Sequence, residues 1–197
     1  MSSTPLVLAS TSPFRRELLA RLGLPFETAS PDLDERALPG ESAQALVMRL
    51  AEAKARAVAD RHPDALIIGS DQVASIGGVV LGKPGSRARA VEQLQYASGR
   101  TAVFRTGLCL LNAASGQARV HCEPFKVHFR GLDRARIEAY VDREQPLNCA
   151  GSFKSEGLGI ALFRRLEGDD PNALIGLPII RLIDMLLDEG IDVLAAH

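Results

Sequence analysis

The stretch that most constrains the fold lies near the N-terminus, where a short apolar run leads directly into the start of a helix. Residues 6–9 have the composition of a strand, and Ser12 and Pro13 follow closely. Ser12 is a preferred helix cap, and Pro13 suits the first helical position, where a missing N–H costs no hydrogen bond. The pattern therefore predicts a strand joined to a helix over residues 14–22.

The same helix start gathers groups that bind anions. Free backbone N–H groups, hydroxyls that include Ser10, and the guanidinium groups of Arg15 and Arg16 converge there. Such a place attracts anions, and phosphate in particular. Phe14 lies among them, although phosphate binding needs no aromatic ring. We therefore predict a phosphate site beside which a flat group also binds.

The rest of the chain mixes helix-linked strands with strands joined by turns. We expect strands at 25–29, 65–70, 101–111, 119–129 and 160–166, a hairpin at 73–81, and helices at 42–61, 86–97, 133–143 and 178–189. A loop rich in glycine and serine covers residues 148–159. This order predicts an α/β fold, with a mixed β-sheet and flanking helices.

Charge and cysteine content exclude several classes of protein. The chain has 23 Lys and Arg against 24 Asp and Glu, a net charge of −1, which argues against a binder of duplex nucleic acid. Three cysteines without CxxC spacing predict neither a disulfide framework nor a zinc site. The N-terminus lacks a secretory signal pattern, and no apolar run is long enough to span a bilayer. We expect a cytoplasmic protein with no nucleic-acid or membrane partner.

Two carboxylates are candidates for chemistry. Asp71 follows the predicted buried strand 65–70, at the edge where open α/β sheets bind ligands; a turn or helix-capping aspartate is the alternative. The amide of neighbouring Gln72 can read a hydrogen-bonding ligand. Glu35 lies in an acidic loop, where a solvated charge is the alternative. Two such carboxylates together with substrate phosphates would hold Mg²⁺.

Two lysines are candidates for phosphate binding. Lys83 follows Gly77-x4-Gly82, which matches most of the P-loop pattern, but Pro84 stands where that pattern needs a hydroxyl. The segment is therefore not a P-loop, although a lysine fixed in this place can still point at phosphate. Lys54 lies near the apolar stripe of its predicted helix, so it is either a surface lysine or one that reaches inward.

Glu156 lies in the loop over residues 148–159 and is a candidate for base recognition. In a pocket, its carboxylate would accept from the adjacent N–H donors on one edge of guanine. Uracil and thymine offer only one N–H there. A solvated loop charge is the alternative.

Taken in order, these segments resemble the Maf family of nucleoside triphosphate pyrophosphatases nearly from end to end. The markers are Leu8-Ala9-Ser10-x-Ser12-Pro13-x-Arg15, Asp34-Glu35, Glu52-x-Lys54-Ala55, Gly69-x-Asp71, Gly82-Lys83-Pro84, Ala150-Gly151 and Gly176-Leu177-Pro178. The resemblance implies one Maf-like domain over residues 1–197, with two lobes around a central cleft as in ITPase-like folds. It also implies hydrolysis of nucleoside triphosphates to monophosphate and diphosphate, a divalent cation (Mg²⁺ or Mn²⁺), and a homodimer.

Three positions depart from the usual family pattern. Phe14, Gln72 and Glu156 stand where Arg, Thr and Gln are usual, and this combination resembles the branch that acts on 7-methyl-GTP. Methylation at N7 makes the purine cationic, which strengthens its stacking on Phe14 and its attraction to Glu156. An arginine at position 14 would repel such a base.

The resemblance and the chemistry together predict a role for each residue. Asp71 is the proton acceptor, Glu35 and Asp71 bind the metal, Ser10, Arg15, Lys54 and Lys83 bind phosphate, and Phe14, Gln72 and Glu156 select the base. The expected role is to keep modified nucleotides out of nucleic acids. Two other functions stay open at this point: a nucleotide-binding regulator of septum formation and cell division, and a dTTP/UTP pyrophosphatase.

Overall fold

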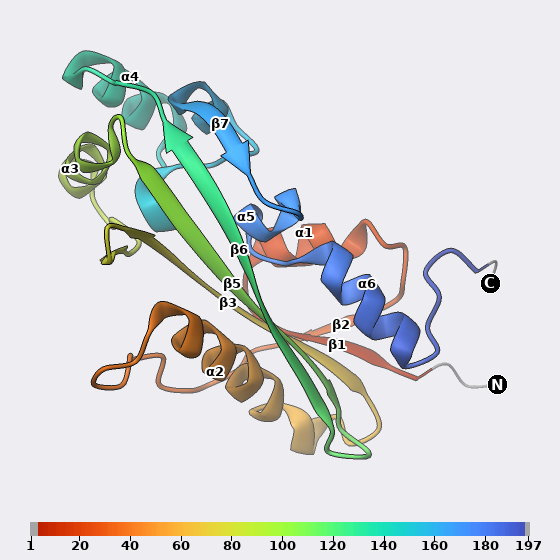
Figure 1. Cartoon of the computed structure of the whole chain (residues 1–197). Helices are drawn as coiled ribbons and strands as arrows, with labels where there is room; N and C mark the ends of the chain where they lie inside the picture. The colour runs from red at the N-terminus through yellow and green to blue at the C-terminus, as the bar shows by residue number, and fades with distance from the viewer. Residues whose placement is uncertain (1–3, 196–197) are drawn as a thin grey trace. The chain divides into compact units, whose positions relative to one another are not determined.

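The computed structural model describes residues 4–195, so both ends of the predicted domain 1–197 lie outside the described residues (Figure 1). The strands are β1 (Leu6–Ala9), β2 (Glu27–Ala29), β3 (Leu66–Ile76), β4 (Val79–Leu81), β5 (Thr101–Asn112), β6 (Ala118–Phe129) and β7 (Phe163–Glu167). The α-helices are α1 (Pro13–Ala20), α2 (Ala43–Arg56), α3 (Arg87–Ala97), α4 (Arg134–Glu144), α5 (Pro171–Ile175) and α6 (Ile179–Asp188). Short 3₁₀ helices are η1 (Ala59–Arg61), η2 (Ala150–Ser152) and η3 (Leu158–Leu162). None of these helices is long and apolar enough to cross a membrane.

The strands form one mixed sheet. Its order is β2-β1-β3-β5-β6-β7, and β4 pairs with β3 beside this path. β1 runs parallel to β2 and β3, whereas β4 is antiparallel to β3 and β7 is antiparallel to β6. The predicted mixed-sheet α/β fold is confirmed.

The chain divides into two compact units, each with its own apolar core. The first unit holds residues up to 72, 105–123 and those from 176 onward; the second holds 73–104 and 124–175. The core of the first unit includes Val7, Ile67 and Leu111. The core of the second is rich in phenylalanine, with Phe104, Phe125, Phe129, Phe153 and Phe163 all buried. In the second unit, α3 packs against α4.

In the first unit, two glycines let α2 lie directly on the sheet. A Cβ at Gly69 would stand 2.0 Å from the carbonyl oxygen of Ala51, and one at Gly107 would stand 2.0 Å from that of Val47. No other residue leaves room for so close an approach. α2 therefore covers one face of this part of the sheet (Figure 1). Since side chains alternate along a strand, Ser70 faces the opposite side from Gly69.

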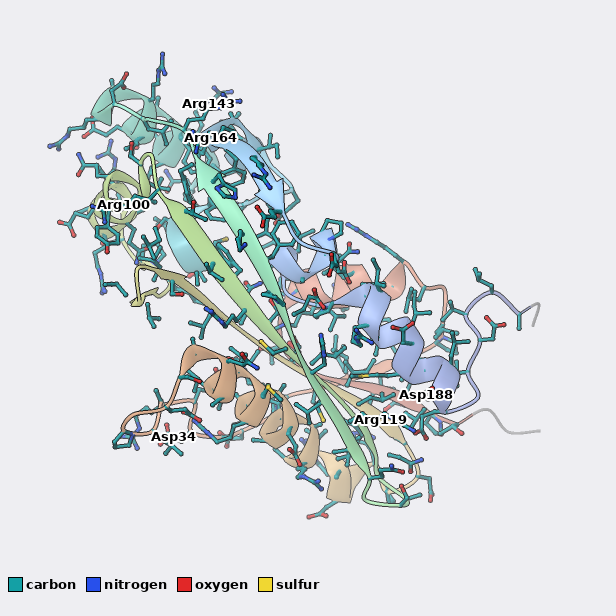
Figure 2. All side chains as sticks on the ribbon, in the orientation of Figure 1. Asp34, Arg100, Arg119, Arg143, Arg164 and Asp188 are labelled. Carbon is teal, nitrogen blue, oxygen red and sulfur yellow. The ribbon has the colours of Figure 1, made fainter. Side chains whose placement is uncertain are left out.

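Helix α6 is tied to the β5–β6 hairpin by a polar cluster around Arg119. Arg119 and Asp188 lie side by side in Figure 2, with Nε 3.7 Å from Oδ2. Arg119 also pairs with Glu189, which accepts a 2.8 Å hydrogen bond from Nδ2 of Asn112. The hydrogen bonds from Asn112 and Arg119 lower the pKa of Glu189. The cluster holds the end of α6 against the hairpin.

The prediction that a strand ends at residue 70 was wrong, because β3 continues through Asp71 to Ile76. The residues beyond Asp71 find a partner strand: Ala74 pairs with Leu81 and Ile76 with Val79. The hairpin itself was correctly predicted, and Gly77 and Gly78 both adopt positive φ in its turn. Asp71 is therefore a residue inside a long strand and not one that follows a strand.

Other boundaries also differ. The helix predicted over 42–61 ends at Arg56 and is followed by η1, and the strand predicted over 160–166 begins only at Phe163, after η3. In a short apolar run, the spacing of apolar residues does not distinguish a strand from a 3₁₀ turn. Helix α5 was not predicted from the sequence. The Asp170 carboxylate, just before it, accepts a 2.8 Å hydrogen bond from the backbone N–H of Asn172.

Candidate active site

A buried ion pair lies at the centre of the candidate site. Nζ of Lys54, on α2, lies 2.7 Å from Oδ1 of Asp71, on β3, and the two side chains are only 7% and 10% exposed. Lys54 continues the buried stripe of α2 formed by Val47, Leu50 and Ala51. The inward-reaching alternative for Lys54 is therefore correct. Asp71 is neither a turn residue nor a helix cap.

Glu35 approaches the same ammonium group from a loop. Its Oε1 lies 3.0 Å from Nζ of Lys54, although the Glu35 side chain is 56% exposed. Two carboxylates, from a strand and from a loop, thus converge on one cation. Carboxylate oxygens arranged in this way are hard ligands suited to Mg²⁺ or Mn²⁺.

The Glu35 loop is held in part by Arg36, Glu41 and Arg49, which the sequence did not single out. Arg49, on α2, donates from Nε to Oε1 of Glu41 over 2.7 Å and from Nη2 to the carbonyl oxygen of Arg36 over 3.1 Å. Asp34, labelled in Figure 2, in turn accepts from the guanidinium of Arg36. These contacts attach the segment that follows Glu35 to α2, and Asp34 is joined to that segment through Arg36. Glu41 and Arg49 are eight residues apart, and this spacing does not predict an ion pair from the sequence.

Arg15 brings a second cation to the carboxylates. Its Nε donates to the carbonyl oxygen of Gly176 over 2.8 Å, and Oγ of Ser70 donates to the same oxygen over 2.9 Å. Burial lowers the pKa of Arg15, while the negative charges of Asp71 and Glu35 act in the opposite direction. Arginine keeps its charge in proteins, so a permanent positive charge lies near enough to both carboxylates to interact with them.

The start of α1 has the predicted capping geometry. Oγ of Ser12 accepts from the backbone N–H of Arg15 over 3.4 Å, and Pro13 is the first helical residue. Oγ of Ser10 accepts from the N–H of Ser12 over 3.1 Å, and Ser10 is buried. The hydroxyl groups therefore shape the backbone at this helix start, next to the cation of Arg15.

The predicted base-selecting residues of the first unit are Phe14 and Gln72. Phe14 lies in the first turn of α1 and is partly buried. Nε2 of Gln72 donates to Oγ1 of Thr106, on β5, over 3.0 Å. Since neighbouring residues of a strand face opposite sides, Gln72 points away from the α2 face that Asp71 occupies. Thr106 is a further residue that the sequence did not single out.

The other two predicted residues, Lys83 and Glu156, belong to the second unit, and both side chains are exposed. Oγ of Ser155 donates to Oε2 of Glu156 over 3.2 Å. Burial raises the pKa of the Cys149 thiol, and among the nearby charges Glu156 raises it further while Lys83 lowers it. Both charges therefore lie in the surroundings of Cys149, and the shift makes this thiol a poor nucleophile.

The structure thus connects Arg15, Glu35, Lys54 and Asp71 in the first unit, with Ser10 at the adjacent helix start. The chain matches the family described as Maf-like protein over residues 5–189, nearly its whole length. The chain belongs to the Maf family. The family resemblance drawn from the sequence motifs is confirmed.

Curated relatives of this Maf chain match it along almost their full length. The 7-methyl-GTP pyrophosphatase of Pseudomonas aeruginosa is 60% identical over 188 residues, which cover 95% of this chain and 98% of that protein. The proteins of the same name from Alcanivorax borkumensis and Nitrosococcus oceani are 63% and 59% identical, and they cover 94% and 96% of this chain. The alignments cover 94% and 95% of those two relatives.

Among solved structures, the Ham1 protein of Staphylococcus aureus has a similar fold. The TM-score is 0.52 with 16% sequence identity, over 95% of this Maf chain and 100% of the other. At this identity the similarity concerns the fold alone. It agrees with the ITPase-like, mixed-sheet architecture expected from the sequence.

Proposed function

We propose that this Maf protein hydrolyses 7-methyl-GTP to 7-methyl-GMP and diphosphate. The observation that carries the proposal is the identity of about 60% to proteins named for that activity, over nearly the whole chain. The chain also has the three residues, Phe14, Gln72 and Glu156, that suit a cationic purine. The proposed partner is therefore a small nucleotide, in the cytoplasm, and the proposed role is to remove modified nucleotides before their incorporation into nucleic acid.

In the proposed reaction, a water oxygen attacks the α-phosphorus. A new P–O bond forms there, the bond from the α-phosphorus to the oxygen that bridges to the β-phosphorus breaks, and diphosphate leaves. The carboxylate of Asp71 takes the proton of the water as general base. Lys54 supports this role, because its 2.7 Å contact holds the Asp71 side chain in one place on β3.

Arg15, Lys54 and Lys83 are the cations that we propose to neutralise the phosphate charge. Arg15 and Lys54 lie beside the carboxylates of the first unit and would bind the phosphates and the negative charge that develops on the leaving diphosphate. Lys83 would also bind phosphate, and the start of α1, which follows Ser10 closely in the chain, would supply backbone N–H groups.

The donor set also suits a divalent cation. Glu35 and Asp71 already converge on a single positive charge, that of Lys54. Among residues 4–195 no group of three or more His, Cys, Asp and Glu side chains is placed to hold a metal, so phosphate oxygens and water would complete the coordination. When bound, Mg²⁺ or Mn²⁺ would act as a Lewis acid that withdraws charge from the phosphates.

Base selection would use stacking and hydrogen bonds. Phe14 would offer its ring face to the methylated purine, and Glu156 would accept from the N1–H and N2–H₂ edge of guanine. Gln72, oriented by its hydrogen bond to Thr106, would read a further polar group of the base.

Release of diphosphate from 7-methyl-GTP with Mg²⁺ tests the proposal, in parallel with GTP, UTP and dTTP. We expect the highest kcat/KM for 7-methyl-GTP. Asp71→Asn should lower kcat by about 10²–10⁴-fold, the usual contribution of a general base, while nucleotide binding persists in a calorimetric titration. Binding of 7-methyl-GTP without turnover by the wild-type protein would contradict the proposal and favour a regulator. A preference for UTP or dTTP would refute the assignment of the base.

A further inference from the structure

The loop that carries Glu156 is anchored in the second unit on the N-terminal side of that residue. Phe153 is buried in the core, and its ring centroid lies 4.7 Å from that of Phe163 and 5.3 Å from that of Phe104. The backbone N–H of Lys154 donates to the hydroxyl of Tyr140, on α4, over 3.1 Å. The chain is therefore firmly placed two residues before Glu156.

Glu144, the last residue of α4, holds the same loop on both sides of Glu156. Its Oε2 accepts from the backbone N–H of Leu158 over 2.8 Å. Its Oε1 lies 3.4 Å from Nζ of Lys154, and that ammonium also donates to the carbonyl oxygen of Glu144 over 3.1 Å. One carboxylate thus connects the positions two before and two after Glu156.

Gly157 leaves the space in which this carboxylate lies. A Cβ at Gly157 would stand 2.9 Å from Oε1 and 3.0 Å from Oε2 of Glu144. A side chain at this position would displace the Glu144 carboxylate, so Gly157 leaves room for the carboxylate to lie against the loop.

Helix formation by itself does not favour a glutamate at this position. A negative charge at a helix C-terminus opposes the helix dipole. Here Lys154 offsets that cost, because its ammonium lies against both the carboxylate and the carbonyl oxygen of Glu144. The Glu144 side chain is also largely covered, with 18% exposed. Its main interactions are therefore with the loop and not with solvent.

We infer that Glu144 is a positioning residue for recognition of the base. It holds the backbone at Lys154 and Leu158 so that the intervening Glu156 carboxylate stays where it can accept from the guanine edge. This inference rests on the proposed function, in which Glu156 reads that edge. Ser155 donates to Glu156 from the adjacent position, which orients the carboxylate but does not fix the loop in space. Glu144 itself need not touch the nucleotide.

The test compares substrates within each variant. For wild type, Glu144→Ala, Glu144→Gln and Glu156→Gln, kcat/KM is measured with 7-methyl-GTP and with UTP, and their ratio is taken. A ratio cancels any loss of folded protein, since both substrates meet the same preparation. The matched control is Glu138→Gln, on the same helix, where the carboxylate pairs over the helix surface with Arg134, four residues away.

We expect Glu144→Ala to lower the ratio by about tenfold, because a small displacement of a recognition group is costly. Glu144→Gln keeps an oxygen for Leu158 and should recover part of the ratio, and Glu138→Gln should leave it unchanged. In a Glu156→Gln background, Glu144→Ala should change the ratio no further, since the group it positions is gone.

An unchanged ratio in Glu144→Ala, when Glu156→Gln lowers it, would overturn the inference and leave the proposed function intact. An equal drop in the Glu156→Gln background would also overturn it, because Glu144 would then act by another route. A wild-type protein with no preference for 7-methyl-GTP over UTP would instead refute the proposed function.

Discussion

Replacing Lys54 with methionine removes one charge from a buried pair and leaves the other in place. Methionine has a similar length and an apolar, flexible stem, so little cavity is created. What remains is the Asp71 carboxylate, 10% exposed, without the ammonium that lay 2.7 Å away. Removing one partner of a buried ion pair costs about 3–5 kcal/mol.

Two features of the site set the expected value within that range. Glu35 is 56% exposed, so its own loss of Lys54 adds about 0–1 kcal/mol. Arg15 stays near Asp71 and compensates part of the lost attraction. We therefore expect Lys54→Met to lower the free energy of unfolding by about 3 kcal/mol, at the lower end of the range for buried pairs.

Urea unfolding followed by circular dichroism measures this value, since the chain has no tryptophan for fluorescence. The control is Arg56→Met on the same helix, whose pair with Glu52 is exposed and worth about 0.3–0.5 kcal/mol. Adding Asp71→Asn to Lys54→Met should recover at least about 1 kcal/mol, because no unpaired charge then stays buried. Equal costs for Lys54→Met and Arg56→Met, or no recovery in the double variant, would refute the reasoning.

Two further predictions concern stability. A hydrogen bond from Arg49 lowers the pKa of Glu41 from 4.5 to about 2, so the stabilisation that Glu41 provides is present above pH 4.5 and is lost as the pH falls towards 2. Glu41→Gln should therefore have a lower Tm than wild type near neutral pH and a similar Tm at about pH 2. A constant Tm difference between the two proteins across this pH range would contradict this prediction. Gly69→Ala would place a Cβ 2.0 Å from the carbonyl oxygen of Ala51, so we expect a loss of about 3 kcal/mol in urea unfolding. Gly82→Ala, with open space around the added Cβ, is the control, and equal losses would show that α2 does not lie so close to the sheet.

Local rules were sufficient for the elements that depend on near neighbours. Ser12 and Pro13 predicted the start of α1, whereas the position of Lys54 near the apolar stripe of its helix left a surface lysine and an inward-reaching one both open. The end of the strand before Asp71 was misplaced, because β3 is extended by pairing with β4, which an apolar run cannot reveal. Sequence motifs also predicted the family correctly, since seven short matches in the right order are specific together.

The sequence by itself determined the mixed α/β fold, the capped helix at Ser12 and the set of charged residues available for chemistry. These follow from short-range periodicity, capping and composition. Only the tertiary structure decided which charges meet: Lys54 with Asp71 and Glu35, and Arg15 with a carbonyl oxygen 161 residues away. Such contacts depend on how closely a helix approaches the sheet. Gly69 permits the close approach of α2, but no local sequence pattern predicts it.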